Sequence, residues 1–141
     1  PVPGASFIDQ LRTEDVVDRG YMGGLGAADA DGLRGWADER LARDYLYADC
    51  EPEATADAIA RLRPQAQSPY VEPCPLAAFP GTPATYVVCT EDRLVKPEWS
   101  RGVARERLGA DLVEMPGGHS PFLSRPGHLA GVLHHAALPR S

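Results

Sequence analysis

Two loops of the sequence carry residues whose types could do chemistry together. Glu91 and Asp92 follow an apolar run that ends at Cys89, and His119 stands in a second loop at residues 116–122. A carboxylate beside an imidazole fixes which ring nitrogen holds the proton and stabilises the imidazolium form, as a general base requires. In isolation Asp92 would be a turn cap and His119 an exposed loop histidine. Their shared setting after strands predicts an acid–base pair instead, with Glu91 the weaker candidate for the acid.

The elements expected around these loops place both groups at one edge of a sheet. Residues 84–89 form a continuous apolar, β-branched run of strand length, and residues 111–115 give a second short strand. Between them, Pro97 is expected to open a helix that Gly109 closes. Because ligands bind beyond the carboxyl ends of parallel strands, the loops after both strands would form the functional edge.

The last expected element is a helix that covers the sheet. Ser124 is predicted to cap it, with Pro126 near its first position. The order strand, helix, strand, helix over residues 84–137 predicts a βαβ unit with a covering helix. The apolar stripe of that helix would consist of Leu129, Val132, Leu133, Ala136 and Ala137.

The first 80 residues show no convincing strand and follow a different pattern. Short helical stretches are separated by glycine and proline, and the clearest begins near Pro52 and stops at Pro64. Residues 21–28 are predicted to be a flexible loop. Residues 64–83 hold six prolines and are expected to form an extended linker.

Two strands are too few for the sheet that this pattern predicts. A run as apolar as residues 84–89 is typical of a strand buried on both faces, and two parallel strands do not make an independently stable sheet. We therefore expect the chain to be part of a larger α/β fold. The strand at 84–89 should pair on one side only and leave apolar surface exposed.

Three segments of the sequence together resemble the C-terminal part of an α/β-hydrolase: residues 86–92, the helix opened by Pro97, and residues 117–122. The resemblance is to the group of plant methylesterases and hydroxynitrile lyases with its bacterial esterase relatives. Residues 46–53 are similar to that group's cap.

This resemblance implies an organisation and a set of roles. Residues 1–80 would form a helical cap with a proline-rich return linker, and residues 81–141 the C-terminal βαβα part of the hydrolase core. In the family the acid orients the histidine and the histidine activates a serine, so these roles are implied for Asp92 and His119.

The departure from the family is the nucleophile. No GxSxG occurs in the sequence, and Ser120 cannot replace it, because it lies beside His119 rather than on a strand-to-helix elbow. The resemblance implies that the nucleophilic serine precedes the cap. We therefore expect ester hydrolysis by a Ser-His-Asp mechanism in a complete carboxylesterase. The chain alone should be inactive and should need the N-terminal half of the fold, from the same gene product or a partner chain.

Other activities on the same fold stay open at this point. A thioesterase would use the same residues. Hydroxynitrile lyases of this group carry a lysine directly after the catalytic histidine, where this chain has Ser120, so ester hydrolysis is favoured. A non-catalytic remnant that binds a small molecule also remains, because the hydrolase fold serves binding as well as catalysis.

Composition restricts the expected partners. The 141 residues include 14 Lys and Arg against 20 Asp and Glu, a net charge of −6, so neither nucleic acid nor an anionic membrane surface is an expected partner. No apolar run approaches the roughly 20 residues of a membrane-spanning helix. The three cysteines lack metal or redox spacing, which favours a reduced, cytoplasmic protein. A small apolar ester is the expected substrate, and a homo-oligomer stays open.

Two weaker patterns predict no further site. Residues 24–29 begin like a GxGxxG phosphate loop, but no strand precedes them and they end in Asp29. His128, His134 and His135 lie on or beside the last helix without companion carboxylates in register, which favours a solvated helix face over a metal site. We therefore expect neither a metal nor an organic cofactor.

Overall fold

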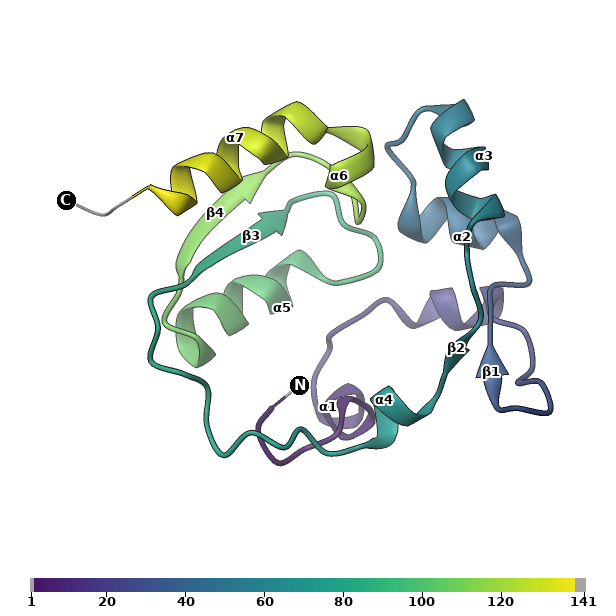
Figure 1. Cartoon of the computed structure of the whole chain (residues 1–141), viewed down its shortest axis with the longest axis horizontal. Helices are drawn as coiled ribbons and strands as arrows, with labels where there is room; N and C mark the ends of the chain where they lie inside the picture. The colour runs from purple at the N-terminus through teal and green to yellow at the C-terminus, as the bar shows by residue number, and fades with distance from the viewer. Residues whose placement is uncertain (1, 139–141) are drawn as a thin grey trace.

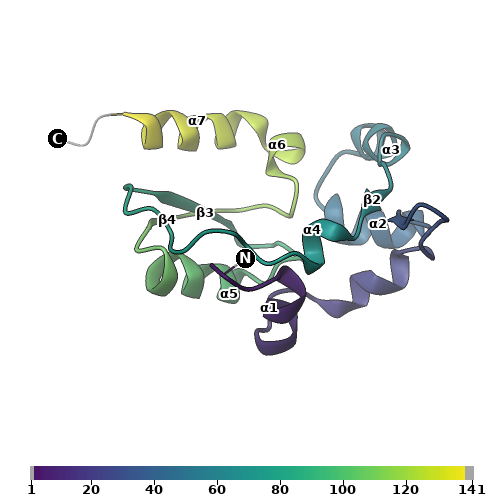
Figure 2. The same ribbon diagram turned by 60° about the horizontal axis from the view of Figure 1, so that its bottom comes forward.

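The C-terminal half builds three layers around a small parallel sheet (Figure 1, Figure 2). The computed structural model describes residues 2–138. Strands β3 (Thr85–Cys89) and β4 (Asp111–Met115) pair in parallel. Helix α5 (Pro97–Gly102) lies on one face of the pair and α7 (Pro126–Ala137) on the other. The predicted order of elements is confirmed, and the chain has the α/β class expected for part of a larger fold.

The helical connection between the two strands begins at a proline and ends at a glycine, as the sequence predicted. Pro97 takes the first helical position, where its missing N–H costs no hydrogen bond. Helix α5 continues into a π-helical turn, η2 (Val103–Arg107), so the expected single helix has two geometries. Gly109 then adopts a φ of +56°, a left-handed conformation that glycine reaches without strain and that ends the helical segment.

The start of the last helix differs from the prediction. Ser124 is not its cap, because Ser124 ends a separate short helix, α6 (Pro121–Ser124), and Arg125 is the N-cap of α7. The Ser124 hydroxyl instead donates to the Ser120 carbonyl at 3.4 Å. A proline stands at the start of each of the two helices, so one expected element becomes two.

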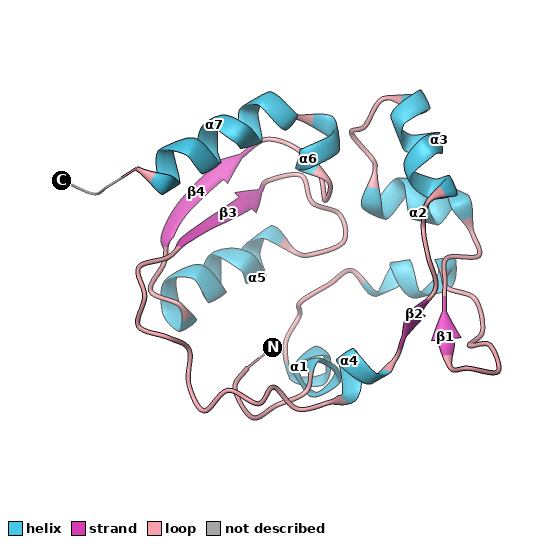
Figure 3. Ribbon diagram, viewed as in Figure 1, coloured by secondary structure: helices cyan, strands magenta, loops and turns pink. Residues whose placement is uncertain are grey.

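The first half is mostly helical and includes one small ladder (Figure 3). Its elements are α1 (Phe7–Thr13), the 3₁₀ helix η1 (Arg19–Gly24), β1 (Leu33–Arg34), α2 (Glu39–Leu46), α3 (Pro52–Ala60), β2 (Gln65–Ala66) and α4 (Ser68–Val71). The expectation that this half holds no strand is wrong, because β1 and β2 pair as antiparallel strands. Two residues are too few to show alternation in a sequence. The predicted loop at 21–28 is also partly wrong, since it begins inside η1.

The sheet is only partly covered. Val88 of β3 and Met115 of β4 are buried, but the other residues of β3 are only half-buried, so the strand leaves part of its apolar surface exposed, as expected. Helix α7 buries no residue, and Leu133 of its apolar stripe is 55% exposed. Within residues 2–138, β3 pairs with β4 alone, as expected. None of the helices in this described part is long and apolar enough to cross a membrane.

Hydrogen exchange tests the one-sided pairing of β3. In a parallel strand, successive residues direct their N–H groups to opposite edges. The Thr90 amide donates to the Met115 carbonyl, so Val88 faces β4 and Val87 faces the open edge. We expect the Val87 amide to exchange at least about tenfold faster than the Val88 amide, measured by NMR in one sample. Equal protection of the two neighbours would contradict an open edge.

Glu14 ties the N-terminal segment to the helix between the strands. Its carboxylate accepts hydrogen bonds from the Trp99 indole at 2.7 Å, from Arg107 at 2.8 Å and from Gln10 at 3.2 Å. Burial alone would raise the pKa of this carboxyl, but the three hydrogen bonds together outweigh burial and lower the pKa. Folding therefore favours the charged form of Glu14.

Stability should fall as Glu14 is protonated. A carboxyl whose pKa is lowered by folding contributes stability that is complete above its unfolded pKa and is lost as the pH falls through its folded pKa. We expect Glu14→Gln to lower the urea midpoint at pH 7 and to flatten its decline at pH values below 4.5, the ordinary pKa of the group. The exposed Glu53→Gln is the control and should keep the wild-type profile. Identical pH dependence in wild type and Glu14→Gln would refute the role of these bonds.

Candidate active site

The loops after β3 and β4 are held together by backbone hydrogen bonds. The Glu91 amide donates to the Gly117 carbonyl at 3.0 Å, and both residues lie two positions past the ends of their strands. The parallel pairing therefore continues beyond the sheet. This continuation brings Asp92 and His119 side by side, where the sequence predicted them.

Asp92 uses its two carboxylate oxygens for separate tasks. Oδ1 accepts hydrogen bonds from the backbone amides of Leu94 at 2.8 Å and Val95 at 3.0 Å, which closes a tight turn. Oδ2 lies 2.9 Å from Nδ1 of His119. The side chain is only 14% exposed, so little water competes for these bonds. The turn thus orients Asp92 independently of its contact with His119.

The pairing with Asp92 decides which nitrogen of His119 is free to react. A carboxylate only accepts hydrogen bonds, so Nδ1 carries the proton and Nε2 keeps its lone pair. No residue among 2–138 makes a hydrogen bond to Nε2, and the side chain is 30% exposed. A ring held in this way can take a proton at Nε2, and the adjacent carboxylate stabilises the imidazolium that results.

Glu91 does not share this pairing. Its side chain is exposed and makes no hydrogen bond or ion pair with any described residue, while its backbone amide contacts the His119 loop. Of the two neighbouring acids, the geometry therefore places Asp92 on the histidine.

A segment from the start of the chain supports the Asp92 turn, which the sequence did not indicate. Val17 pairs with Val95 in an isolated antiparallel bridge, and the Lys96 amide donates to the Val16 carbonyl at 2.9 Å. The Lys96 ammonium also binds Asp15 at 2.6 Å. These contacts hold the Asp92 turn in place. They join residues about eighty positions apart, so no local sequence pattern could have revealed them.

The turn that presents His119 requires both of its glycines, for different reasons. Gly117 has a φ of +130°, a backbone conformation that other residues rarely adopt. Gly118 is needed because a Cβ there would stand 2.7 Å from Oδ1 of Asp49. The sequence indicated the tight turn but not the approach of Asp49, whose carboxylate lies 3.6 Å from Arg125.

Neither of the nearest sulfur and hydroxyl groups is presented as a nucleophile. Burial raises the pKa of the Cys89 thiol, and the negative charges of Asp92 and Asp49 raise it further. A protonated thiol is a weak nucleophile. Ser120 is 3% exposed and is the N-cap of α6.

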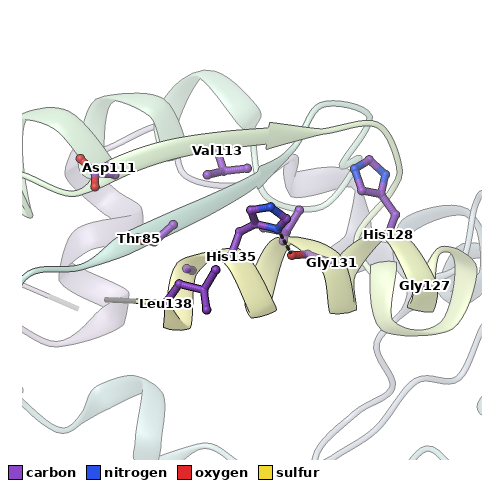
Figure 4. Close-up of a pocket in the computed structure, with 10 residues that line it drawn as sticks. Thr85, Asp111, Val113, Gly127, His128, Gly131, His135 and Leu138 are labelled. Carbon is purple, nitrogen blue, oxygen red and sulfur yellow. Dashed lines mark hydrogen bonds between the residues drawn. The ribbon is translucent and has the colours of Figure 1, made fainter. Parts of the chain in front are cut away.

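The more apolar of the two largest pockets does not contain the acid–base pair. A cleft of about 580 Å³ separates the sheet from α7, with Thr85 and Val113 on the strand side and His135 and Leu138 on the helix side (Figure 4). The cleft lies where the helix face and the sheet face are not in contact, and neither Asp92 nor His119 lines it. A smaller pocket of about 470 Å³ includes the acid itself and is lined by Asp18, Leu41, Asp44, Tyr45, Asp92, Arg93, Lys96 and Pro97.

The weaker sequence patterns form no site in the described structure. Among residues 2–138, no group of three or more His, Cys, Asp or Glu side chains is placed to hold a metal ion. His135 bonds through Nδ1 to the Gly131 carbonyl of its own helix at 3.0 Å. Gly24, in the glycine-rich segment, packs against the ring of Trp36, where a Cβ would be 2.6 Å away.

Known proteins resemble this chain in sequence and in fold. The family model described as the alpha/beta hydrolase family matches residues 3–130. A curated protein, the alpha/beta hydrolase nvfD of Aspergillus novofumigatus (strain IBT 16806), is 34% identical over 96 residues, which cover 67% of this chain and 38% of that protein.

Solved structures show the same fold at low sequence identity. A mutant of polyneuridine aldehyde esterase superposes with a TM-score of 0.76 at 12% identity, covering 98% of this chain and 58% of that one. A pyrethroid hydrolase from Sphingobium faniae JZ-2 gives a TM-score of 0.68 at 17% identity, covering 95% of this chain and 55% of that one. The chain thus spans little more than half the length of these structures and about two fifths of the curated relative.

Replacing Asp92 by Asn should move the proton on His119. Two backbone N–H donors face Oδ1, so the amide oxygen of Asn would stay with them and its NH₂ group would turn toward the ring. An NH₂ group donates, so Nδ1 becomes the acceptor and the proton moves to Nε2. We expect the ¹⁵N shifts of the His119 ring to show Nδ1–H in the wild type and Nε2–H in Asp92→Asn. The exposed Asp57→Asn should leave the tautomer unchanged, and an unchanged tautomer in Asp92→Asn would count against the pairing.

Proposed function

The chain belongs to the alpha/beta hydrolase family, and we propose that it supplies the acid and the base of a Ser-His-Asp site that hydrolyses esters. The observation that carries the proposal is the 2.9 Å contact between Oδ2 of Asp92 and Nδ1 of His119 at neighbouring strand ends. In this proposal Asp92 orients the ring, His119 is the general base, and the nucleophile is a serine outside these 141 residues.

The proposed reaction uses the free nitrogen of His119 twice. A serine hydroxyl attacks the ester carbonyl and gives its proton to Nε2, and the proton then passes to the leaving alcohol as the acyl–serine forms. A water molecule next attacks the acyl group, with Nε2 again taking the proton and returning it to serine as the acid is released. Asp92 stabilises the imidazolium in both halves of the cycle.

The substrate class in the proposal is a small, fairly apolar ester. Residues 1–80 would act as the cap, since α2 and α3 lie beyond the ends of the strands that carry the pair (Figure 1). Leu41 and Tyr45 of α2 contribute apolar surface to the pocket that reaches Asp92, which charged residues such as Lys96 also line. Ser120 follows the base where the related lyases carry lysine, and this favours hydrolysis over cyanide elimination.

We also propose that the remainder of a hydrolase fold covers the exposed apolar parts of this chain. The Val87 amide faces the unpaired edge of β3, and Leu133 of α7 is exposed at a pocket that Pro83 and Thr85 also line. An additional strand and helix would bury both surfaces, as an α/β sheet requires. The same remainder would bring the serine.

A fluorophosphonate probe tests this function, because it labels only a serine that a nearby base activates. We expect the protein expressed from its natural reading frame to be labelled at a serine outside the 141 residues and to hydrolyse p-nitrophenyl butyrate. His119→Ala should lower kcat by about 10⁴-fold and abolish labelling. Asp92→Asn should lower kcat by about 10³- to 10⁴-fold.

His134→Ala is the matched control, because this histidine is exposed on α7 and should leave hydrolysis unchanged. Hydrolysis that survives His119→Ala at the wild-type rate would overturn the assignment. Labelling of Ser120 would overturn the proposal that the nucleophile lies outside the chain.

A further inference from the structure

A buried carboxylate from the first half of the chain lies against the turn that presents His119. Asp49 stands in the segment between α2 and α3, and its side chain is only 15% exposed. Both of its oxygens are buried and accept no hydrogen bond from any residue among 2–138. A charged group buried in this way is costly unless a nearby charge or dipole compensates it, so its presence calls for an explanation.

The contacts of Asp49 are with the two glycines before the base. A Cβ on Gly118 would stand 2.7 Å from Oδ1 of Asp49, and a Cβ on Gly117 would stand 3.2 Å from Oδ2. Asp49 therefore fills the space that side chains would take at these two positions. With Asp49 in place, neither position has room for a side chain, and the carboxylate packs against both residues of the turn.

Arg125 completes the arrangement from the other side of the turn. Its Nε lies 3.6 Å from Oδ2 of Asp49 and 2.9 Å from the Cβ position of Gly117, and it has no hydrogen-bond partner among the described residues. The two opposite charges are each other's nearest compensation. The Arg125 side chain is 39% exposed and reaches water, whereas Asp49 is mostly buried, so removing Arg125 would leave a buried carboxylate without a compensating charge, which is destabilising.

Asp49 also lies near Cys89 at the end of β3. Its negative charge contributes, after burial and Asp92, to the raised pKa of the Cys89 thiol at the end of β3. The carboxylate thus lies against the turn that leads to His119 and near the end of the strand that leads to Asp92.

We propose that Asp49, held by Arg125, is a positioning residue that backs the Gly117–Gly118 turn and thereby fixes His119 against Asp92. This inference rests on the proposed function, because it concerns the same base. Its consequence is that the base is correctly placed only while the segment between α2 and α3 is docked on the turn. Docking of that segment and correct placement of His119 then occur together.

The test measures kcat, KM and the NMR signal of the His119 ring in the same full-length protein. Asp49→Asn keeps the shape of the side chain and removes the charge that holds Arg125. We expect kcat to fall by about 10- to 100-fold with KM changed by less than about twofold, because a small misplacement of the base affects the chemical step. The Nδ1–H proton signal of His119 should shift or broaden, while Asp57→Asn on α3 should leave both measurements at wild-type values.

A second set of variants keeps the test decisive if Asp49→Asn unfolds. Gly118→Ala should disturb the His119 signal and lower kcat, because its Cβ meets Oδ1 of Asp49. Combining it with Asp49→Ala removes that clash, so the double variant should be less impaired than the two single effects combined. Strictly independent effects of the two changes would overturn the proposal.

The outcomes separate the positioning role from the catalytic one. Unchanged kcat and an unchanged His119 signal in Asp49→Asn would overturn the positioning role while His119→Ala still abolishes hydrolysis. A shifted His119 signal in Asp49→Asn, together with hydrolysis that is insensitive to His119→Ala, would support the positioning and refute the proposed function.

Discussion

The parallel pairing of β3 with β4 is the interaction on which the rest of the site depends. It sets the two strands in register, and the bond from the Glu91 amide to the Gly117 carbonyl extends that register into the loops. Without this extension, two loops of different sequence would have no reason to end within hydrogen-bond reach. The chemistry of Asp92 and His119 is therefore a consequence of backbone geometry first and of side-chain type second.

Around that pairing, each loop is held by a group from the first half of the chain. The segment at 15–18 fastens the turn of Asp92 through Val17 and Lys96, and Asp49 lies against the turn that precedes His119. Backbone amides orient the acid, and the acid orients the base. A displacement of either turn would therefore also displace the side chain paired with it. A rigid acid–base pair on two loops requires such support, because loops have few packing contacts of their own.

The sheet is incompletely covered, although the acid and the base at its edge are paired. Helix α7 lies over β3 and β4 but buries no residue, and the cleft beneath it is apolar. An α/β layer is stable when its apolar face is buried, and no element within residues 2–138 buries this face. The chain spans 55–58% of the length of the similar solved hydrolases. In our proposal, the open edge and the cleft are the surfaces against which the rest of such a fold packs.

Local signals in the sequence were enough to predict the strands, the helix opened by Pro97, the Gly109 turn and the pair of Asp92 with His119. Each of these depends on residues a few positions apart, and the family resemblance added their roles. The two-residue ladder of β1 and β2, the division of the last helix, and the contacts of Asp49 could not be read in this way. Those features depend on which distant segments meet, and a buried charge such as Asp49 acquires its partner only when the chain has folded. The sequence thus determined which groups could react, and the tertiary structure decided what holds them in place, because long-range packing leaves no periodic trace in the chain.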